Sequence, residues 1–94
     1  MYFLYVCEKM NKILKFSSTW CSPCKQMELQ LEKLQNILQK DILIEKVDVD
    51  VDSNLSKQYS VRSIPTLIKL DAFGVEVDRM TGSVTDAKLL AFVS

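Results

Sequence analysis

The sequence predicts one α/β domain in which a mixed central sheet is flanked by helices. Three observations support this fold class: a long segment with helical periodicity, strand-like runs on both sides of it, and a hairpin-like pair of runs in the second half. A helix between two strand candidates favours a right-handed crossover between parallel strands. Because 94 residues fall within the usual size of one domain, the whole chain (1–94) is assigned to it. The expected element order is βαβαββα.

The first half of the chain supplies the long helix and its two strands. Lys12 to Phe16 is rich in apolar residues and indicates a strand, which Ser17-Ser18-Thr19 ends. From Ser22 to about Gln39, apolar residues recur at spacings of three and four, which predicts an amphipathic helix with one buried face. The residues of that face are Met27, Leu31, Leu34 and Leu38. Ile42 to Val49 is rich in branched side chains and predicts the second strand.

The second half supplies shorter elements. Ser53 is the expected N-cap of a short helix through about Tyr59. Thr66 to Leu70 predicts a strand, Gly74 a hairpin turn, and Val75 to Met80 the antiparallel partner. Gly82 ends that strand, and Thr85 or Ser83 is expected to cap a last helix, Asp86 to Val93.

Charge and composition exclude several classes of partner. Twelve acidic and twelve basic residues cancel, so no basic surface indicates nucleic acid or an anionic membrane as a partner. The apolar stretch Met1 to Cys7 is too short for a secretory signal and lacks its positive region, and no stretch is long enough to span a bilayer. A cytoplasmic location is the resulting expectation. In that reducing compartment, a C-x-x-C pair indicates redox or metal chemistry rather than a structural disulfide.

The motif with the clearest chemistry is Trp20-Cys21-Ser22-Pro23-Cys24-Lys25, where a strand ends and the long helix begins. Unpaired amides and the positive dipole at a helix start stabilise a thiolate, which is the reactive form of cysteine. Cys21 precedes the helix and is expected to be exposed and to attack first, whereas Cys24 resolves the mixed disulfide. Pro23 fits the first helical turn because its missing N–H would be unpaired there anyway.

Metal binding is a weaker interpretation of the same cysteines. Zinc requires four ligands as a rule, and the sequence has no histidine and only Cys7 besides this pair, so carboxylates would have to complete a site. Two ordinary structural cysteines are the remaining alternative. The acidic run Asp48 to Asp52 lacks the glycine and glutamate of a calcium loop, since Ser53 and Tyr59 occupy those places. No metal site is therefore expected.

The chain resembles the thioredoxin family, in which W-C-x-P-C-K opens the active-site helix. The resemblance extends from about Lys12 to Pro65 and, after one inserted residue near Ala72 or Phe73, to the end of the chain. It implies the thioredoxin fold, here with a shortened N-terminal segment similar to small, phage-type members. Ile64-Pro65-Thr66 resembles the cis-proline loop of the family, and Gly82 its substrate-groove glycine.

By this resemblance, a protein substrate lies beside the dithiol in an extended conformation. The backbone of Ile64 pairs with it, and Trp20 serves as a contact surface. Ser22, Pro23, Lys25 and Gly82 are the other supporting residues that the resemblance implies. Ser22 and Ser63 replace glycines of the family pattern and remain small.

The sequence departs from the family below the resolving cysteine. Lys15 occupies the position of the usual buried aspartate, and Lys46 matches the lysine that accompanies it. Glu28 lies four residues after Cys24, on the same helix face, where it is able to pair with Lys15 or Lys46 and to handle the proton of Cys24. A cation buried there would also favour the Cys24 thiolate. The alternative is that Lys15 extends its charge to solvent along an apolar stem.

The expected function is that of a thiol–disulfide oxidoreductase, which reduces protein disulfides in cell redox homeostasis and electron transport with no bound cofactor. The resemblance implies disulfide-containing protein substrates, a thioredoxin reductase as electron donor, ribonucleotide reductase as an acceptor, and a monomer. A glutaredoxin-like reductase using glutathione is one alternative, although the tryptophan before Cys21 argues against it. A thioredoxin-fold binding subunit is another. Cys7 is assigned no role, and Met10 is an alternative start.

Overall fold

The computed structural model describes residues 12–38 and 43–93. The strands are β1 (Lys12–Ser17), β2 (Leu43–Asp48), β3 (Thr66–Leu70) and β4 (Glu76–Thr81). The helices are α2 (Ser22–Leu38), α3 (Ser53–Gln58) and α4 (Asp86–Val93). This order confirms the predicted βαβαββα arrangement. Cys7, Met10, Gln39 and Ile42 lie outside the described residues, so the structure does not test what was expected of them.

The four strands form one mixed sheet in the order β2-β1-β3-β4. β1 and β2 are parallel, with Phe16 opposite Val47, as expected for strands joined by a helical crossover. β1 and β3 are antiparallel, with Phe16 opposite Thr66, and β4 continues the sheet antiparallel to β3. The carboxyl ends of β1 and β2 therefore lie at the same edge of the sheet as the start of β3.

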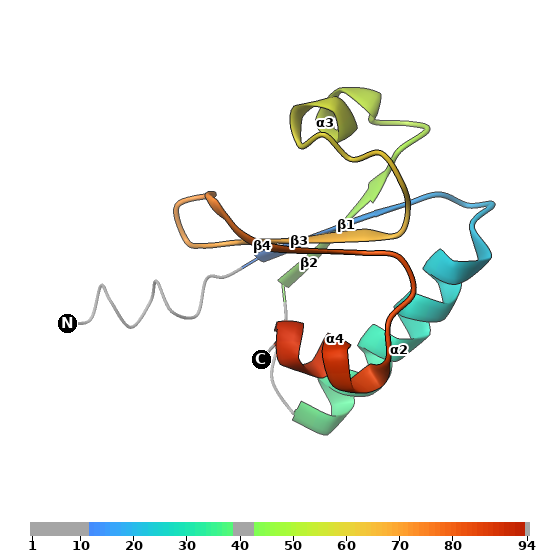
Figure 1. The fold of residues 1–94 in the computed structure, drawn as a ribbon, viewed down its shortest axis with the longest axis vertical. Helices are drawn as coiled ribbons and strands as arrows, with labels where there is room; N and C mark the ends of the chain where they lie inside the picture. The colour runs from blue at the N-terminus through green and yellow to red at the C-terminus, as the bar shows by residue number, and fades with distance from the viewer. Residues whose placement is uncertain (1–11, 39–42, 94) are drawn as a thin grey trace.

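Helices cover both faces of this sheet (Figure 1). α2 and α4 lie on one face, where they enclose the larger core, and α3 lies on the other. The predicted stripe of α2 is confirmed at Met27, Leu31 and Leu34, which are at most 4% exposed. The larger core consists of Ile13, Met27, Leu31, Leu34, Leu67, Leu89, Phe92 and Val93. Among the described residues, no helix is long and apolar enough to cross a membrane.

Local hydrogen bonds explain why some observed boundaries differ from the predicted ones. Asp52, not Ser53, is the N-cap of α3, because its side chain accepts a hydrogen bond from the backbone N–H of Leu55. Thr85 caps α4, where its hydroxyl accepts a hydrogen bond from the N–H of Lys88 at 3.3 Å. β4 begins one residue later than predicted, because the Val75 carbonyl accepts from Asp71 within the turn.

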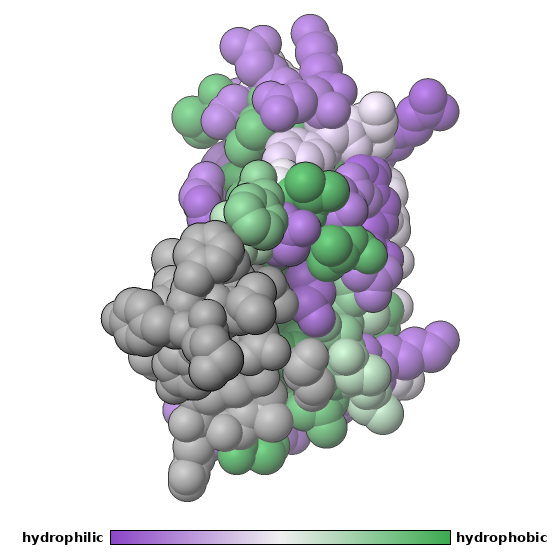
Figure 2. Space-filling view, turned by 90° about the vertical axis from the view of Figure 1, so that its left-hand side faces the viewer, coloured by the Kyte–Doolittle hydropathy of each residue, from purple (hydrophilic) through white to green (hydrophobic). Residues whose placement is uncertain are grey.

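The β3–β4 hairpin carries exposed apolar side chains. Figure 2 views the side of the molecule where this hairpin turns, and in its coloured part hydrophobic and hydrophilic residues are intermixed. Phe73, Val75 and Val77 are all more than half exposed. Along β4, the charged residues Glu76 and Asp78 flank Val77, a pattern that protects an edge strand from pairing with another chain.

Candidate active site at the start of helix α2

The two cysteines of the motif meet where β1 leads into α2. Cys21 directly precedes the helix and Cys24 lies in its first turn, and a disulfide joins them with their Cα atoms 5.2 Å apart. The backbone N–H of Cys24 donates a hydrogen bond to Sγ of Cys21 at 3.2 Å. The start of the helix thus directs an amide at the sulfur, as the sequence predicts.

The expectation that Cys21 is exposed is wrong for this disulfide state. Cys21 is 5% exposed and Cys24 is 2% exposed. The cross-link and the hydrogen bond from Cys24 both join the Cys21 sulfur to the first turn of α2. Cys21 nonetheless remains the more accessible of the two cysteines, and exchange requires that an incoming thiolate reach only one sulfur.

Trp20 presents its ring to solvent beside the disulfide. The residue is 69% exposed, and its indole Nε1 donates a hydrogen bond to Oδ2 of Asp50 at 2.8 Å. Asp50 follows β2, so the parallel pairing of β1 and β2 brings the two residues together across 30 positions of sequence. Sequence reasoning did not assign Asp50 to the site, although the shared carboxyl edge of two parallel strands was a usable signal.

The proline loop and Gly82 lie at the same edge of the sheet. The Ile64–Pro65 peptide is cis, which confirms the conformation expected from the resemblance. Thr66 follows it and pairs with Phe16 near the end of β1, and the N–H of Gly82 donates to the Pro65 carbonyl at 2.8 Å. Gly82 has a φ of +85°, a conformation that glycine adopts without strain. Residues from three separate segments therefore gather around one edge.

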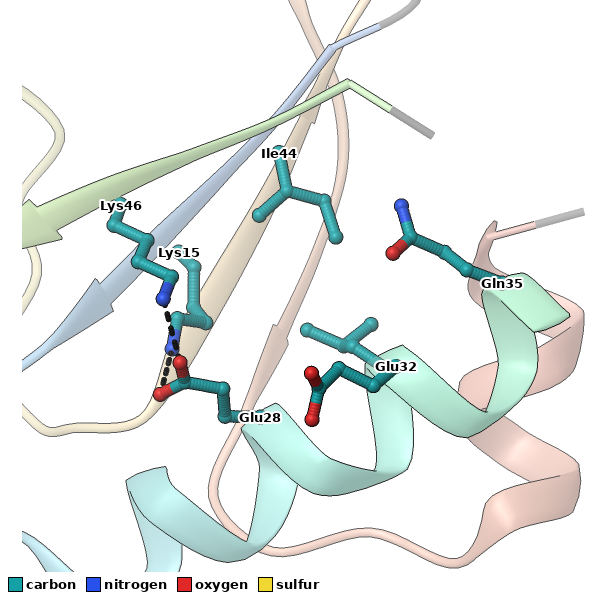
Figure 3. A pocket seen from close by; sticks show the side chains of 7 residues that line it. Lys15, Glu28, Glu32, Gln35, Ile44 and Lys46 are labelled. Atoms are coloured by element: carbon teal, nitrogen blue, oxygen red, sulfur yellow. Dashed lines mark hydrogen bonds and ion pairs between the residues drawn. The ribbon is translucent and has the colours of Figure 1, made fainter. Parts of the chain in front are cut away.

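Glu28 joins the two lysines between α2 and the sheet (Figure 3). Its carboxylate accepts from Lys15 at 3.2 Å and from Lys46 at 2.5 Å, so both pairings left open by the sequence exist together. The side chain of Lys15 is 2% exposed, so the alternative that it extends to solvent is wrong. The hydrogen bonds from Lys46 and Lys15 lower the pKa of Glu28.

Other acidic residues near the site have structural partners. Oδ1 of Asp48 accepts from the backbone N–H of Asp50, and Asp52 caps α3. Within the described ranges, no group of three or more His, Cys, Asp or Glu residues is arranged to hold a metal ion. The acidic run after β2 thus has local structural roles.

A disulfide at a helix start, an exposed tryptophan beside it and a cis-proline loop at the same sheet edge define a redox-active dithiol site. A scan against protein families matches residues 3–94 to the thioredoxin family. The chain therefore belongs to the thioredoxin family, whose chemistry is dithiol–disulfide exchange through such a pair. This membership favours the thioredoxin interpretation over the glutaredoxin-like one.

Relatives and a solved structure agree with this assignment. Thioredoxin-1 of Drosophila melanogaster is 40% identical over 58 residues, which are 62% of this chain and 54% of the fly protein. A bifunctional thioredoxin reductase/thioredoxin of Mycobacterium leprae is 33% identical over 82 residues, 87% of this chain and 18% of that protein. The chain thus spans about half the length of the fly relative and a smaller share of the mycobacterial one. A mutant thioredoxin from Halobacterium salinarum superposes with a TM-score of 0.78 at 28% identity, covering 94% of this chain and 75% of the other.

Proposed function

We propose that the protein reduces disulfide bonds of other proteins. The Cys21 thiolate attacks one sulfur of the substrate disulfide, forming a mixed disulfide and releasing the other substrate sulfur as a thiolate. Cys24 then loses its proton and attacks Cys21. The Cys21–Cys24 bond forms, the bond to substrate breaks, and the substrate has gained the two electrons that the protein has lost. The observation that carries this proposal is the Cys21–Cys24 disulfide at the start of α2.

The surroundings of the dithiol suit a protein substrate. Trp20 offers a large exposed ring, and Ser22, Pro23 and Lys25 are exposed on the first turn of α2. The backbone of Ile64 is proposed to pair with an extended substrate segment, in the manner of strand addition. Gly82, whose N–H donates to the Pro65 carbonyl, is proposed to lie beside the same substrate segment.

The redox partners follow from family membership. A thioredoxin reductase is the proposed electron donor, which agrees with the relative that combines both proteins in one chain. Ribonucleotide reductase is a proposed acceptor, and a monomer acting in the cytoplasm is the proposed state. No bound cofactor enters this exchange, because electrons move between sulfur atoms.

Insulin reduction by dithiothreitol tests the chemistry without a known partner. The protein is expected to accelerate precipitation of the insulin B chain, and Cys21→Ser is expected to abolish that acceleration. Cys24→Ser is expected to accumulate a mixed disulfide on Cys21 that mass spectrometry detects. Cys7→Ser serves as the matched control and is expected to keep full activity. Acceleration that survives in Cys21→Ser would contradict the proposal.

Two further comparisons separate this function from its alternatives. Turnover with NADPH and a thioredoxin reductase is expected to exceed turnover with glutathione, and the reverse order would support the glutaredoxin-like function. Replacing both Cys21 and Cys24 with serine is expected to remove the biological effect of the protein. Retention of that effect would support a binding subunit.

A further inference from the structure

The buried ammonium of Lys15 has no part in the exchange described so far. Within the described part of the chain, Lys15 is the only charged residue that is buried, with 2% of its side chain exposed. It extends from β1 on the same face as Ile13, the face that α2 and α4 cover. A charge in this position is costly unless it has partners.

Glu28 pairs with Lys15 but does not cancel its effect in the interior. Lys46 adds a positive charge to this cluster, and Glu28 and the exposed Glu32 add negative ones, so its four charges sum to zero. The side chains of Glu28 and Lys46 are 42% and 65% exposed, so water screens their charges. Lys15 is enclosed by protein, where charges interact more strongly. The positive charge therefore dominates on the buried side of α2.

Cys24 lies on that buried side. Cys24 and Met27 are 2% and 1% exposed and belong to the stripe of α2 that faces the sheet. Helical spacing places residues 24 and 28 next to each other, with Cβ atoms about 6 Å apart. Nζ of Lys15 is 3.2 Å from the Glu28 carboxylate, so the ammonium lies beside the side chain that follows Cys24 by one helical turn.

We propose that the Lys15 ammonium stabilises the thiolate of Cys24, and that the negative charge of Glu28 opposes this effect only in part. This inference rests on the proposed function, since the Cys24 thiolate is the nucleophile of its second step. The thiol of Cys24 gives its proton to solvent, and the resulting anion attacks Cys21 with loss of the substrate thiolate. A nearby cation lowers the free energy of that anion and raises its population at neutral pH.

The same geometry allows a rival role for Glu28, in which its carboxylate accepts the proton of Cys24. A pocket of about 290 Å³ opens beside it, and its charged lining residues are Lys15 from β1, Lys46 from β2, and Glu28 and Glu32 from α2. The two lysines lower the pKa of Glu28, which makes its carboxylate a poorer acceptor for a thiol proton. The two roles predict opposite effects of Glu28→Gln.

The test is to titrate Cys24 in the reduced protein and to monitor the titration through the ¹³Cβ chemical shifts of labelled cysteines. Lys15→Met keeps a long side chain and removes the charge, and it is expected to raise the pKa of Cys24 by about one unit, a tenfold loss of thiolate below that pKa. Glu28→Gln removes the opposing negative charge and is expected to lower the pKa of Cys24. Lys12→Met is the matched control, because Lys12 lies on the same strand but is 44% exposed and pairs with Glu45.

A kinetic measurement gives a second readout. Reaction of the reduced protein with dithiobis(nitrobenzoate) releases one equivalent of coloured thiolate when Cys21 attacks and a second when Cys24 resolves the adduct. In Lys15→Met the second phase is expected to slow about threefold at neutral pH, because tenfold less thiolate is offset by the higher nucleophilicity of a more basic thiol. At a pH above the pKa of Cys24 in both proteins, the variant is expected to react faster than the wild type.

An unchanged Cys24 pKa in folded Lys15→Met would overturn the inference. A slower second phase in Glu28→Gln would also overturn it, because that result is expected if Glu28 accepts the proton. Should Lys15→Met fail to fold, Glu28→Gln alone decides by the sign of its shift in the Cys24 pKa. The titration does not depend on substrate turnover. A protein that fails to reduce insulin but shows these shifts would contradict the proposed function alone.

Discussion

Replacing Glu28 with glutamine tests whether the Lys15–Glu28 pair stabilises the fold. The variant keeps the shape of the side chain but leaves Lys15, with 2% of its side chain exposed, without a carboxylate. Breaking a fully buried ion pair by removing one partner costs roughly 3 to 5 kcal/mol. Because Glu28 is 42% exposed, water screens the pair, and we expect a smaller loss of about 1.5 kcal/mol. For a domain of this size, that loss lowers Tm by about 6 to 12 °C.

The pH dependence of this loss has a definite sign. Lys46 and Lys15 lower the pKa of Glu28 below its ordinary value of 4.5 in the folded state. The ionised carboxylate therefore contributes stability that is present above the unfolded pKa and is lost as pH falls through the folded pKa. The difference in Tm between wild type and Glu28→Gln is expected to be full at pH 7 and to shrink progressively below about pH 4.5.

Thermal unfolding followed by circular dichroism between pH 3 and pH 7 measures both effects. Glu45→Gln is the matched control, since it breaks an ion pair between a β1 lysine and a carboxylate that are both near half exposed. The free energy of unfolding that Glu45→Gln loses is expected to stay below about 1 kcal/mol. The double variant Lys15→Met with Glu28→Gln is expected to recover much of the lost stability, because no buried charge remains unpaired. A Tm of Glu28→Gln equal to wild type at pH 7, or a loss that persists undiminished in acid, would refute this reasoning.

Two further substitutions test a hydrogen bond of α4 and the backbone conformation of Gly82. Lys69→Met removes the hydrogen bond, 3.1 Å long, from Nζ to the Phe92 carbonyl in the last turn of α4. Urea unfolding is expected to show that the free energy of unfolding falls by about 1 kcal/mol. A midpoint equal to wild type would show that this bond contributes nothing. In Gly82→Ala, the new Cβ meets no atom within 4 Å, so only the φ of +85° opposes the substitution. Urea unfolding is expected to show that the free energy of unfolding falls by about 1 to 2 kcal/mol. A stabilised variant would contradict this account.

Local patterns in the sequence were sufficient to predict the main elements. The spacing of Met27, Leu31 and Leu34 predicts α2 because a helix with 3.6 residues per turn must bury one stripe. β3 and α4 have the predicted boundaries, since turn residues and caps flank them. The predicted cap of α3 was wrong because neighbouring residues competed for the same role. Asp52 rather than Ser53 caps α3 because only the geometry of the backbone decides which oxygen reaches the Leu55 amide.

Contacts between distant segments were harder to predict. The bond from Trp20 to Asp50 depends on the parallel register of β1 and β2, which no local pattern contains. The low exposure of Cys21 likewise depends on the disulfide and on the packing around it. Glu28 was identified as a partner for either lysine from helical spacing, but only the packing of α2 over the sheet shows that it contacts both.

The sequence by itself determined the dithiol of this protein, because the C-x-x-C spacing places two sulfurs one helical turn apart and the strand before it sets them at a helix start. The tertiary structure decided which charge is buried between α2 and the sheet. Lys15 is a lysine in any conformation, but it becomes an enclosed cation only when α2 covers the face of β1 from which it projects. Burial depends on neighbours brought together from distant positions, and for this reason the folded chain was needed to reveal it.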